Sequence, residues 1–213
     1  MRYCRNEEKM KRKVVALLMA ALMGTLCLSG CGDSNANSGS TSTEETGSGN
    51  AADADQKAAD EVAALIDAIY VQERTDETDQ QCADAKAAWD ALTDAQKELV
   101  EGEEADPDYF GRDTGDASKD DPRNQDEIGE NEILVVSFGT SFNNSRAADI
   151  KGIEDAIQAA YPDWSVRRAF TAQIIINHVQ AREDEHIDNM DQAMERAVAN
   201  GVKNLVVQPT HLM

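Results

Sequence analysis

Two polar loops in this sequence carry the residue types that hold anions and accept protons. The first, Gly139-Thr140-Ser141, follows the apolar run at residues 133–136. Glycine lets a backbone approach a ligand closely, and hydroxyls beside free amides suit a carboxylate or a phosphate. The second, Pro209-Thr210-His211, follows the apolar run at residues 205–207, and its imidazole can accept a proton or bind a metal. Without further support, the first loop is more often an ordinary turn, and a single histidine is more often structural or exposed.

The surrounding pattern predicts an α/β domain that brings these loops together. We expect strands at residues 132–137, 164–170 and 202–208, of which the first and third are buried because their apolar residues are continuous. Helical spacing predicts helices over residues 145–161 and 188–200, and a helix or helical turn over residues 171–182. Right-handed crossovers would make the strands parallel, so the loops after the first and third strands should converge at one crevice.

Three motifs occur in register across residues 133–213. They are Val135 to Ser141, then Arg167 to Thr171 with Ile174-Ile175, then Val206 to His211. Together they resemble the anaerobic cobalt chelatases, which insert Co²⁺ into sirohydrochlorin in cobalamin biosynthesis. The resemblance implies the chelatase fold, in which two similar α/β halves face each other across a tetrapyrrole cleft. It implies Co²⁺ as the substrate metal and no covalently bound cofactor.

The same resemblance assigns roles to individual side chains. It implies that the tetrapyrrole is held by Ser137, Phe138, Gly139, Thr140, Ser141, Arg168, Phe170 and Thr171. His211 would be the catalytic base, because metallation removes two pyrrole N–H protons. Two of these assignments have alternatives: Arg168 can extend to solvent at a strand end, and Phe170 can pack in the core.

The resemblance covers roughly the first third of a family catalytic domain. The family's metal-binding Glu and His residues would follow Met213, so we expect no metal ligands in residues 132–213, an incomplete first half of the fold, and a truncated chain that is inactive alone. A tetrapyrrole- or metal-binding lipoprotein without catalysis is the second hypothesis, and a non-functional truncation product is the third. A flavodoxin-like flavin site fits poorly because Phe138 interrupts the polar loop, and no nucleotide-binding glycine motif occurs.

Residues 1–31 have the features of a lipoprotein signal peptide. Lys11-Arg12-Lys13 precedes an apolar run, residues 14–28, that is too short to span a bilayer comfortably. Leu28-Ser29-Gly30-Cys31 then resembles a bacterial lipobox, with Cys31 as the lipid attachment site. Residues 32–50 are rich in Ser and Gly, which predicts a flexible tether. We therefore expect export and anchoring on the outer face of the cytoplasmic membrane, with a cleaved signal and an incidental Cys as the alternative.

Residues 51–101 are predicted to form a small helical spacer. Thr78 with Gln81, and Thr93 with Gln96, have the spacing of capping boxes at helix starts. Cys82 is the one thiol that follows Cys31, and we expect it half-buried on a helix. Residues 87–100 resemble small helical repeats in surface proteins of gut Gram-positive bacteria, which implies a spacer or interaction module with its Trp in the core.

The remaining features bear on partners. A net charge of −21 at pH 7, without a basic patch, excludes nucleic acid as a partner. Residues 102–131 are acidic and rich in Gly, Pro and Asn, which predicts a solvated linker. A faint calcium-loop pattern there fails, because Phe110 and Ala117 stand where oxygen ligands are needed. His178 and His186 are expected on the surface, with no metal-ligand spacing between them.

Overall fold

A computed structural model of the protein describes residues 48–211, with side chains from residue 51 onward. The predicted signal peptide, Cys31 and nearly all of the predicted tether lie outside this range, and their predictions stay untested. These described residues lie within one compact unit. Among the helices within residues 48–211, none is both long and apolar enough to cross a bilayer.

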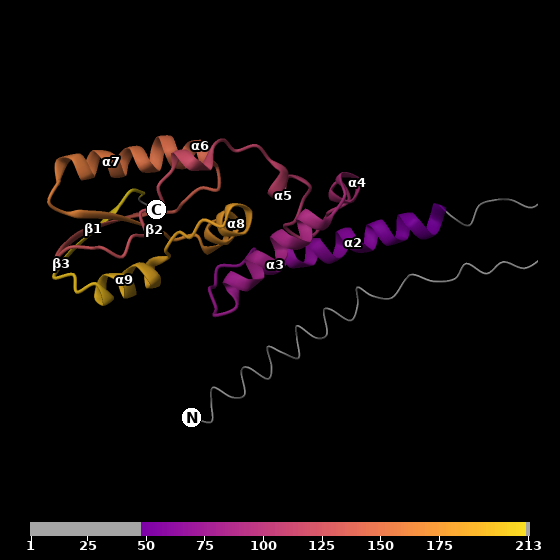
Figure 1. Ribbon diagram of the computed structural model, residues 1–213, viewed down its shortest axis with the longest axis horizontal. Helices are drawn as coiled ribbons and strands as arrows, with labels where there is room; N and C mark the ends of the chain where they lie inside the picture. Colours follow the sequence, from indigo (N-terminus) through magenta and orange to yellow (C-terminus); the bar gives the residue numbers. More distant parts are fainter. Residues whose placement is uncertain (1–47, 212–213) are drawn as a thin grey trace, which may run out of the picture. The chain divides into compact units, whose positions relative to one another are not determined.

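A three-stranded parallel sheet confirms the α/β class. The strands are β1 (Asn131–Ser137), β2 (Ser165–Phe170) and β3 (Asn204–Pro209), in the order β2-β1-β3. The central strand β1 pairs with both neighbours, with Val135 opposite Arg168 on one side and Gln208 on the other. Figure 1 shows helices on both sides of this sheet, as right-handed crossovers between parallel strands require.

Helices follow β1 and β2 in the chain. They are α6 (Asn143–Ser145), which continues through the π-helical turn η2 (Arg146–Ile150) into α7 (Lys151–Ala160), then α8 (Gln173–Glu183) and α9 (Met190–Ala199). α9 begins at a capping box in which Asn189 and Gln192 exchange side-chain and backbone hydrogen bonds. It ends before Gly201, whose φ of +71° suits glycine.

β1 is buried on both faces, as its continuous apolar run predicts. Leu134 and Val136 pack with Ala169 and Ala193 on the face covered by α9. Because side chains alternate along a strand, Ile133 and Val135 point to the opposite face. There they pack with Val166 of β2 and with Ile157 of α7. The strand therefore holds the first polar loop at a fixed point in the middle of the sheet.

β3 is exposed, so the prediction of a buried third strand is wrong. Its Val206 and Val207 are 46% and 45% exposed. Within the described residues, β3 is an edge strand with β1 as its one hydrogen-bonded neighbour, and α7 and α9 cover β1 more fully. Val206 borders an open groove of about 190 Å³ that Ile133, Ile157 and Trp164 also line.

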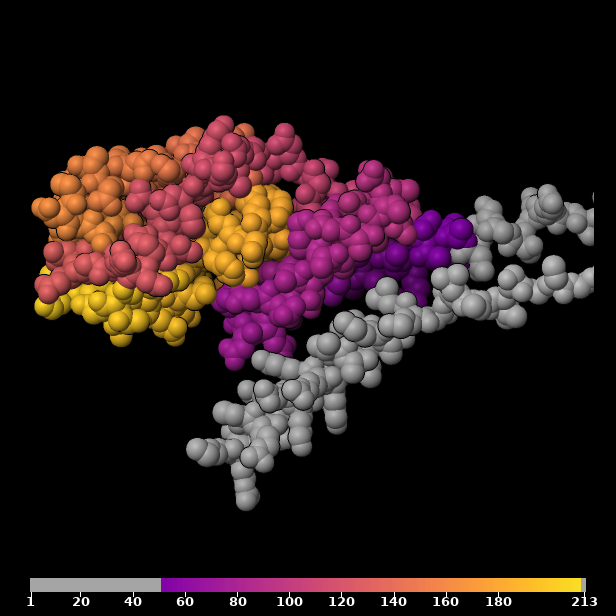
Figure 2. Space-filling model, in the orientation of Figure 1, coloured from indigo at the N-terminus to yellow at the C-terminus, as the bar shows by residue number. Residues whose placement is uncertain are grey.

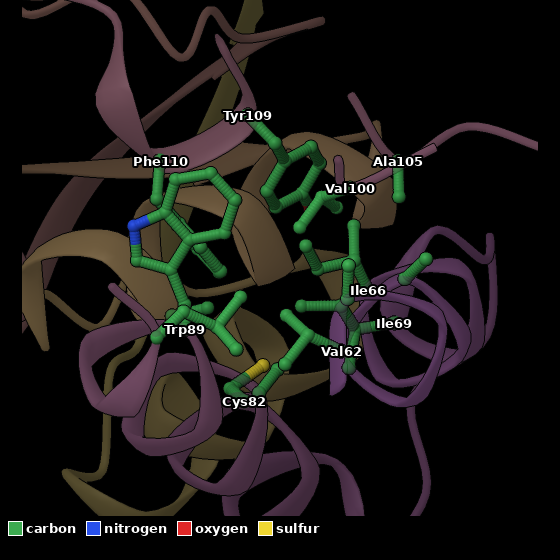
Figure 3. Packing of buried hydrophobic residues seen from close by; sticks show 14 residues of the cluster. Val62, Ile66, Ile69, Cys82, Trp89, Val100, Ala105, Tyr109 and Phe110 are labelled. Carbon is green, nitrogen blue, oxygen red and sulfur yellow. The ribbon is translucent and has the colours of Figure 1, made fainter. Parts of the chain in front are cut away.

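The segment before the sheet forms a helical module, defined here as residues 48–111. Its elements are α2 (Ser48–Ile69), α3 (Thr78–Ala91), α4 (Asp94–Lys97) and α5 (Asp108–Gly111). Figure 3 shows its core, in which Cys82 and Trp89 of α3 face Val62 and Ile66 of α2. Trp89 is a core residue as predicted, and Cys82 lies on a helix but is fully rather than half buried.

One of the two predicted capping boxes forms. Thr93 accepts from the backbone N–H of Gln96, whose side chain accepts in return, so α4 begins as the sequence predicts. The box at Thr78 is wrong, because Thr78 lies inside α3 and its hydroxyl oxygen accepts from the backbone N–H of Thr75.

The acidic segment at residues 102–131 is not simply a solvated linker. Tyr109 and Phe110 are buried in the core of the helical module, and the side chain of Asp120, just after the short 3-10 helix η1 (Ala117–Lys119), has no exposed surface. Burial of aromatic rings and of a paired carboxylate fixes this stretch to the elements around it.

Candidate functional site

The ends of the three strands meet, as predicted, at the carboxyl edge of the sheet. The backbone N–H groups of Thr171 and Ala172, after β2, donate to the carbonyls of Ser137 (3.0 Å) and Phe138 (3.2 Å), after β1. On the other side, the N–H of Thr210 after β3 donates to the carbonyl of Val136 (2.9 Å). These bonds place the loop after β1 between the other two.

Position 139 must be a glycine because of its backbone conformation and the closeness of its neighbours. Its φ is +101°, and a Cβ there would lie 2.5 Å from Cδ2 of Phe170. Phe170 itself is completely buried among Ile176, Val179 and their neighbours. Phe170 therefore packs in the core, which is the alternative that the sequence left open, and it supports the loop from beneath.

The two hydroxyl residues of the first loop stabilise its turn. The Thr140 hydroxyl accepts from the backbone N–H of Phe142 at 3.1 Å, which is a local turn typical of Ser and Thr. The Ser141 carbonyl accepts from Arg182 Nη2 at 2.5 Å. Thr140 and Ser141 are half-buried, and Thr171 is exposed beside them, so hydroxyls from two loops border the same edge of the sheet.

His211 and Phe138 lie together at this edge. Their rings are edge to face with centroids 6.4 Å apart, and Phe138 is 48% exposed. His211 Nδ1 and Ser137 Oγ are both buried and have no hydrogen-bond partner within residues 48–211, although a buried polar atom is usually paired. The arrangement offers an exposed aromatic face and a half-buried imidazole to a ligand, whereas the Ser137 hydroxyl is buried.

Arg168 does not reach this edge, so neither position expected for it holds. Its guanidinium is fully buried, with Nε 2.8 Å from Glu154 Oε1 and Nη1 2.7 Å from Asp120 Oδ2. Because successive side chains of a strand alternate, Arg167 points to the opposite face and pairs there with Glu132 at 2.8 Å. Both arginines hold the sheet to its surroundings, and neither is free to bind a carboxylate.

Asp120 joins two buried arginines. It accepts from Arg168 and also from Arg146 Nε at 3.0 Å. Burial alone would raise the pKa of Asp120, but the hydrogen bond and charge of Arg168 outweigh it, so the pKa lies below its ordinary value. Sequence reasoning missed Asp120 and Arg146, because no periodicity or motif marks them.

The two remaining histidines, His178 and His186, differ in how far they are buried. His186 is exposed, as predicted. His178 is not a simple surface residue, because its ring stacks on Tyr109 at 4.0 Å and its Nε2 lies 2.6 Å from the Tyr109 carbonyl. Burial lowers the pKa of His178 to about 4, so the ring is neutral at pH 7 and Nε2 donates to that carbonyl. Within residues 51–211, no three His, Cys, Asp or Glu side chains form a metal-holding cluster.

Comparison with known proteins finds similarity in the sheet region. Residues 131–213 match the family model described as "Cobalt chelatase (CbiK)". This region of the chain is therefore similar to the cobalt chelatases. The sirohydrochlorin cobaltochelatase of Salmonella typhimurium is 35% identical over 81 residues, which are 38% of this chain and 31% of that protein. The chain thus spans about a third of the length of this curated relative, and no solved structure matches it.

The matched cobalt chelatase region begins where β1 begins, at residue 131. It therefore contains all three loops at the carboxyl edge of the sheet. The helical module and Asp120 precede it, although both contact it closely.

Proposed function

We propose that this chain supplies ring-binding loops of a sirohydrochlorin cobaltochelatase, which inserts Co²⁺ into sirohydrochlorin in cobalamin biosynthesis. One observation carries the proposal: the region that matches the cobalt chelatases contains the loops that meet at the carboxyl edge of the sheet. Because the chain spans 31% of its relative, we assign ring binding to this chain and metal insertion to the whole protein.

Insertion of Co²⁺ into sirohydrochlorin requires a surface that binds the flat ring, groups that bind its carboxylates, and a proton acceptor. The exposed face of Phe138 suits the flat macrocycle. The amide of Gly139 and the hydroxyls of Thr140, Ser141 and Thr171 suit the carboxylates on the ring periphery.

Insertion replaces two pyrrole protons by Co²⁺, so each turnover releases two protons. His211 is only half-buried at this edge, so its imidazole can take a proton from a pyrrole nitrogen and pass it to solvent.

Titration with sirohydrochlorin tests ring binding. The chain should perturb the ring's absorbance spectrum at micromolar concentrations, and Phe138→Ala should weaken this binding. His186→Ala is the matched control, since His186 is exposed and lies outside the three loops. An unperturbed spectrum at all protein concentrations would refute the proposal.

The role of His211 is tested separately in the whole protein by the absorbance change on cobalt insertion. His211→Gln keeps a hydrogen-bonding side chain but cannot accept a proton near neutral pH. Ring binding should persist while the insertion rate falls by about 10²–10⁴-fold, the usual contribution of a positioned base. An unchanged insertion rate would remove His211 from the mechanism.

A second candidate is a lipid-anchored protein that binds haem, another tetrapyrrole or a metal without catalysis. The lipobox-like sequence ending at Cys31 favours it, because cobalamin is made in the cytoplasm. Radiolabelled palmitate should enter the protein on export, and Cys31→Ser should abolish labelling while Cys27→Ser, in the same leader, should not affect it. Tight ring binding with no insertion by the whole protein would favour this candidate over the chelatase.

A further inference from the structure

The helical module packs against α8, the helix that follows the end of β2. Ala181 of α8 lies in the module's hydrophobic core. Asn177 Nδ2 donates to the carbonyl of Ile69 at 2.9 Å, and Gln180 Nε2 donates to Asp79 at 2.7 Å. Figure 2 shows α8 in contact with the module's helices. One face of α8 is thus packed against and hydrogen-bonded to the helical module.

The module also caps the first turn of α8. The residue at the N-cap position, Ala172, has no side chain that could accept from the helix. The Gln72 side chain, from the turn between α2 and α3, supplies the missing acceptor. Its Oε1 accepts from the backbone N–H of Gln173 at 2.9 Å, across 101 residues of sequence.

Three consecutive amides at this point connect the module to the candidate site. The N–H groups of Thr171 and Ala172 donate to the loop after β1, and the next N–H, that of Gln173, donates to Gln72. The opposite face of α8 packs on Phe170, the ring that lies against Gly139. A shift of the first turn of α8 would therefore displace the loop that carries Gly139.

The module and the first loop also share a surface. A cleft of about 220 Å³ is lined by Tyr70, Tyr109 and Arg112 of the module or its end, and by Ser141 and Phe142 of the loop. The guanidinium of Arg112 lies 6.0 Å from the ring centre of Phe142. The contact between the two parts is therefore continuous from α8 to the loop.

We infer that Gln72 is a positioning residue and that the helical module is part of the ring-binding site rather than a spacer. The inference rests on the proposed function for the identity of the ligand. Neither the family match nor the curated relative assigns this role, because the matched region begins at residue 131. Gln72 acts by fixing the amides of residues 171–173, and it does not touch the ligand itself.

Amide hydrogen exchange in the ligand-free chain tests the positioning step. Gln72→Met keeps the side-chain length but removes the acceptor, so exchange at Gln173 and Ala172 should become about threefold to tenfold faster, as for one lost hydrogen bond. Gln72→Glu retains an acceptor and should restore slow exchange. Gln80→Met is the matched control, since the exposed Gln80 bonds within α3 to Asp84. Unchanged exchange at both amides in Gln72→Met would overturn the inference.

Sirohydrochlorin titration of the same variants tests the consequence for the site. Gln72→Met should bind about threefold to tenfold more weakly than the wild type, whereas Gln72→Glu and Gln80→Met should bind normally. Normal binding by Gln72→Met would refute the inference and leave the proposed function standing. If the wild type binds no ring, the proposed function fails, and the exchange rates alone decide whether Gln72 holds the loop.

Discussion

Gly139→Ala is the most direct test of how the first loop is built. The added methyl group would lie 2.5 Å from Cδ2 and 2.8 Å from Cγ of Phe170, well inside contact distance. Phe170 is completely buried, so its ring has no open space to enter. The backbone at residue 139 also has a φ of +101°, which an alanine adopts only with strain.

The expected loss of stability has two parts. A left-handed backbone costs an alanine about 1–2 kcal/mol. Overpacking a buried site by one methyl group costs about 1–3 kcal/mol. The free energy of unfolding should therefore fall by about 2–5 kcal/mol, a large fraction of the about 5–15 kcal/mol that stabilises a typical domain.

Urea denaturation followed by circular dichroism measures this loss, and two other glycines separate its parts. Gly201 has a positive φ of +71° with open space around it, so Gly201→Ala should cost only the backbone part, about 1–2 kcal/mol. Gly152 lies inside α7 with open space and no positive φ. Gly152→Ala should therefore stabilise the protein by about 0.5–1 kcal/mol.

If Gly139→Ala lowered the free energy of unfolding by no more than Gly201→Ala does, the contact with Phe170 would have no energetic effect, and the predicted overpacking would be wrong. A double-mutant cycle provides an independent check. Phe170→Leu removes the ring atoms that the new methyl group meets, so the two substitutions together should cost less than the sum of their separate costs. Strict additivity would show that the strain is confined to the backbone.

Three further predictions concern buried groups. Asp120→Asn removes one of the two carboxylates that bind Arg168, while Glu154 remains, and should cost about 1.5–3 kcal/mol in urea denaturation, as for a hydrogen bond to a charged group; a cost near zero would contradict the buried pairing. Because the pKa of His178 falls from 6.5 to about 4 on folding, its unfolded form binds more protons, so stability should drop by up to about 3 kcal/mol as pH falls from 6.5 to 4. His178→Gln should flatten that drop, and an unchanged pH profile would show that the ring is not buried. Trp89→Ala should cost about 3–5 kcal/mol, whereas a loss below 1 kcal/mol would mean that the module has no tight core.

Local patterns predict much of the sheet region. The run at residues 133–136 can satisfy its apolar side chains only in a covered strand, and β1 begins within one residue of its predicted start. The turn residues after it, and Gly201 after α9, stand where backbone geometry needs them. Parallel order then follows from the crossover rule, and the meeting of the loops follows from parallel order.

The candidate site is less predictable because its contacts join distant parts of the chain. Phe170 lies against Gly139, and Gln72 binds the backbone of Gln173 at the start of α8. No local spacing in the sequence reveals either contact. The exposure of β3 escapes sequence reasoning for a different reason. An apolar run at residues 205–207 has the same composition whether or not another layer covers it, and burial depends on that layer.

The adjacent arginines of β2 show how the acidic segment belongs to the site. Strand geometry sends Arg167 and Arg168 to opposite faces, and burying either charge without a carboxylate would be prohibitive. Glu132 of β1 pairs with Arg167. Arg168 pairs with Glu154 of α7 and also with Asp120, 48 residues away in the segment predicted to be a linker.

Asp120 also binds Arg146, whose Nη1 lies 3.5 Å from the Ser141 carbonyl. The same carboxylate thus neutralises the sheet's buried charge and orients an arginine that supports the first loop. Sequence composition predicts that such a segment is solvated, since acidic residues usually are. Here the arginines on β2 reverse that expectation, because a buried cation requires a buried anion, and one of the two carboxylates that bind Arg168 lies outside the cobalt chelatase match.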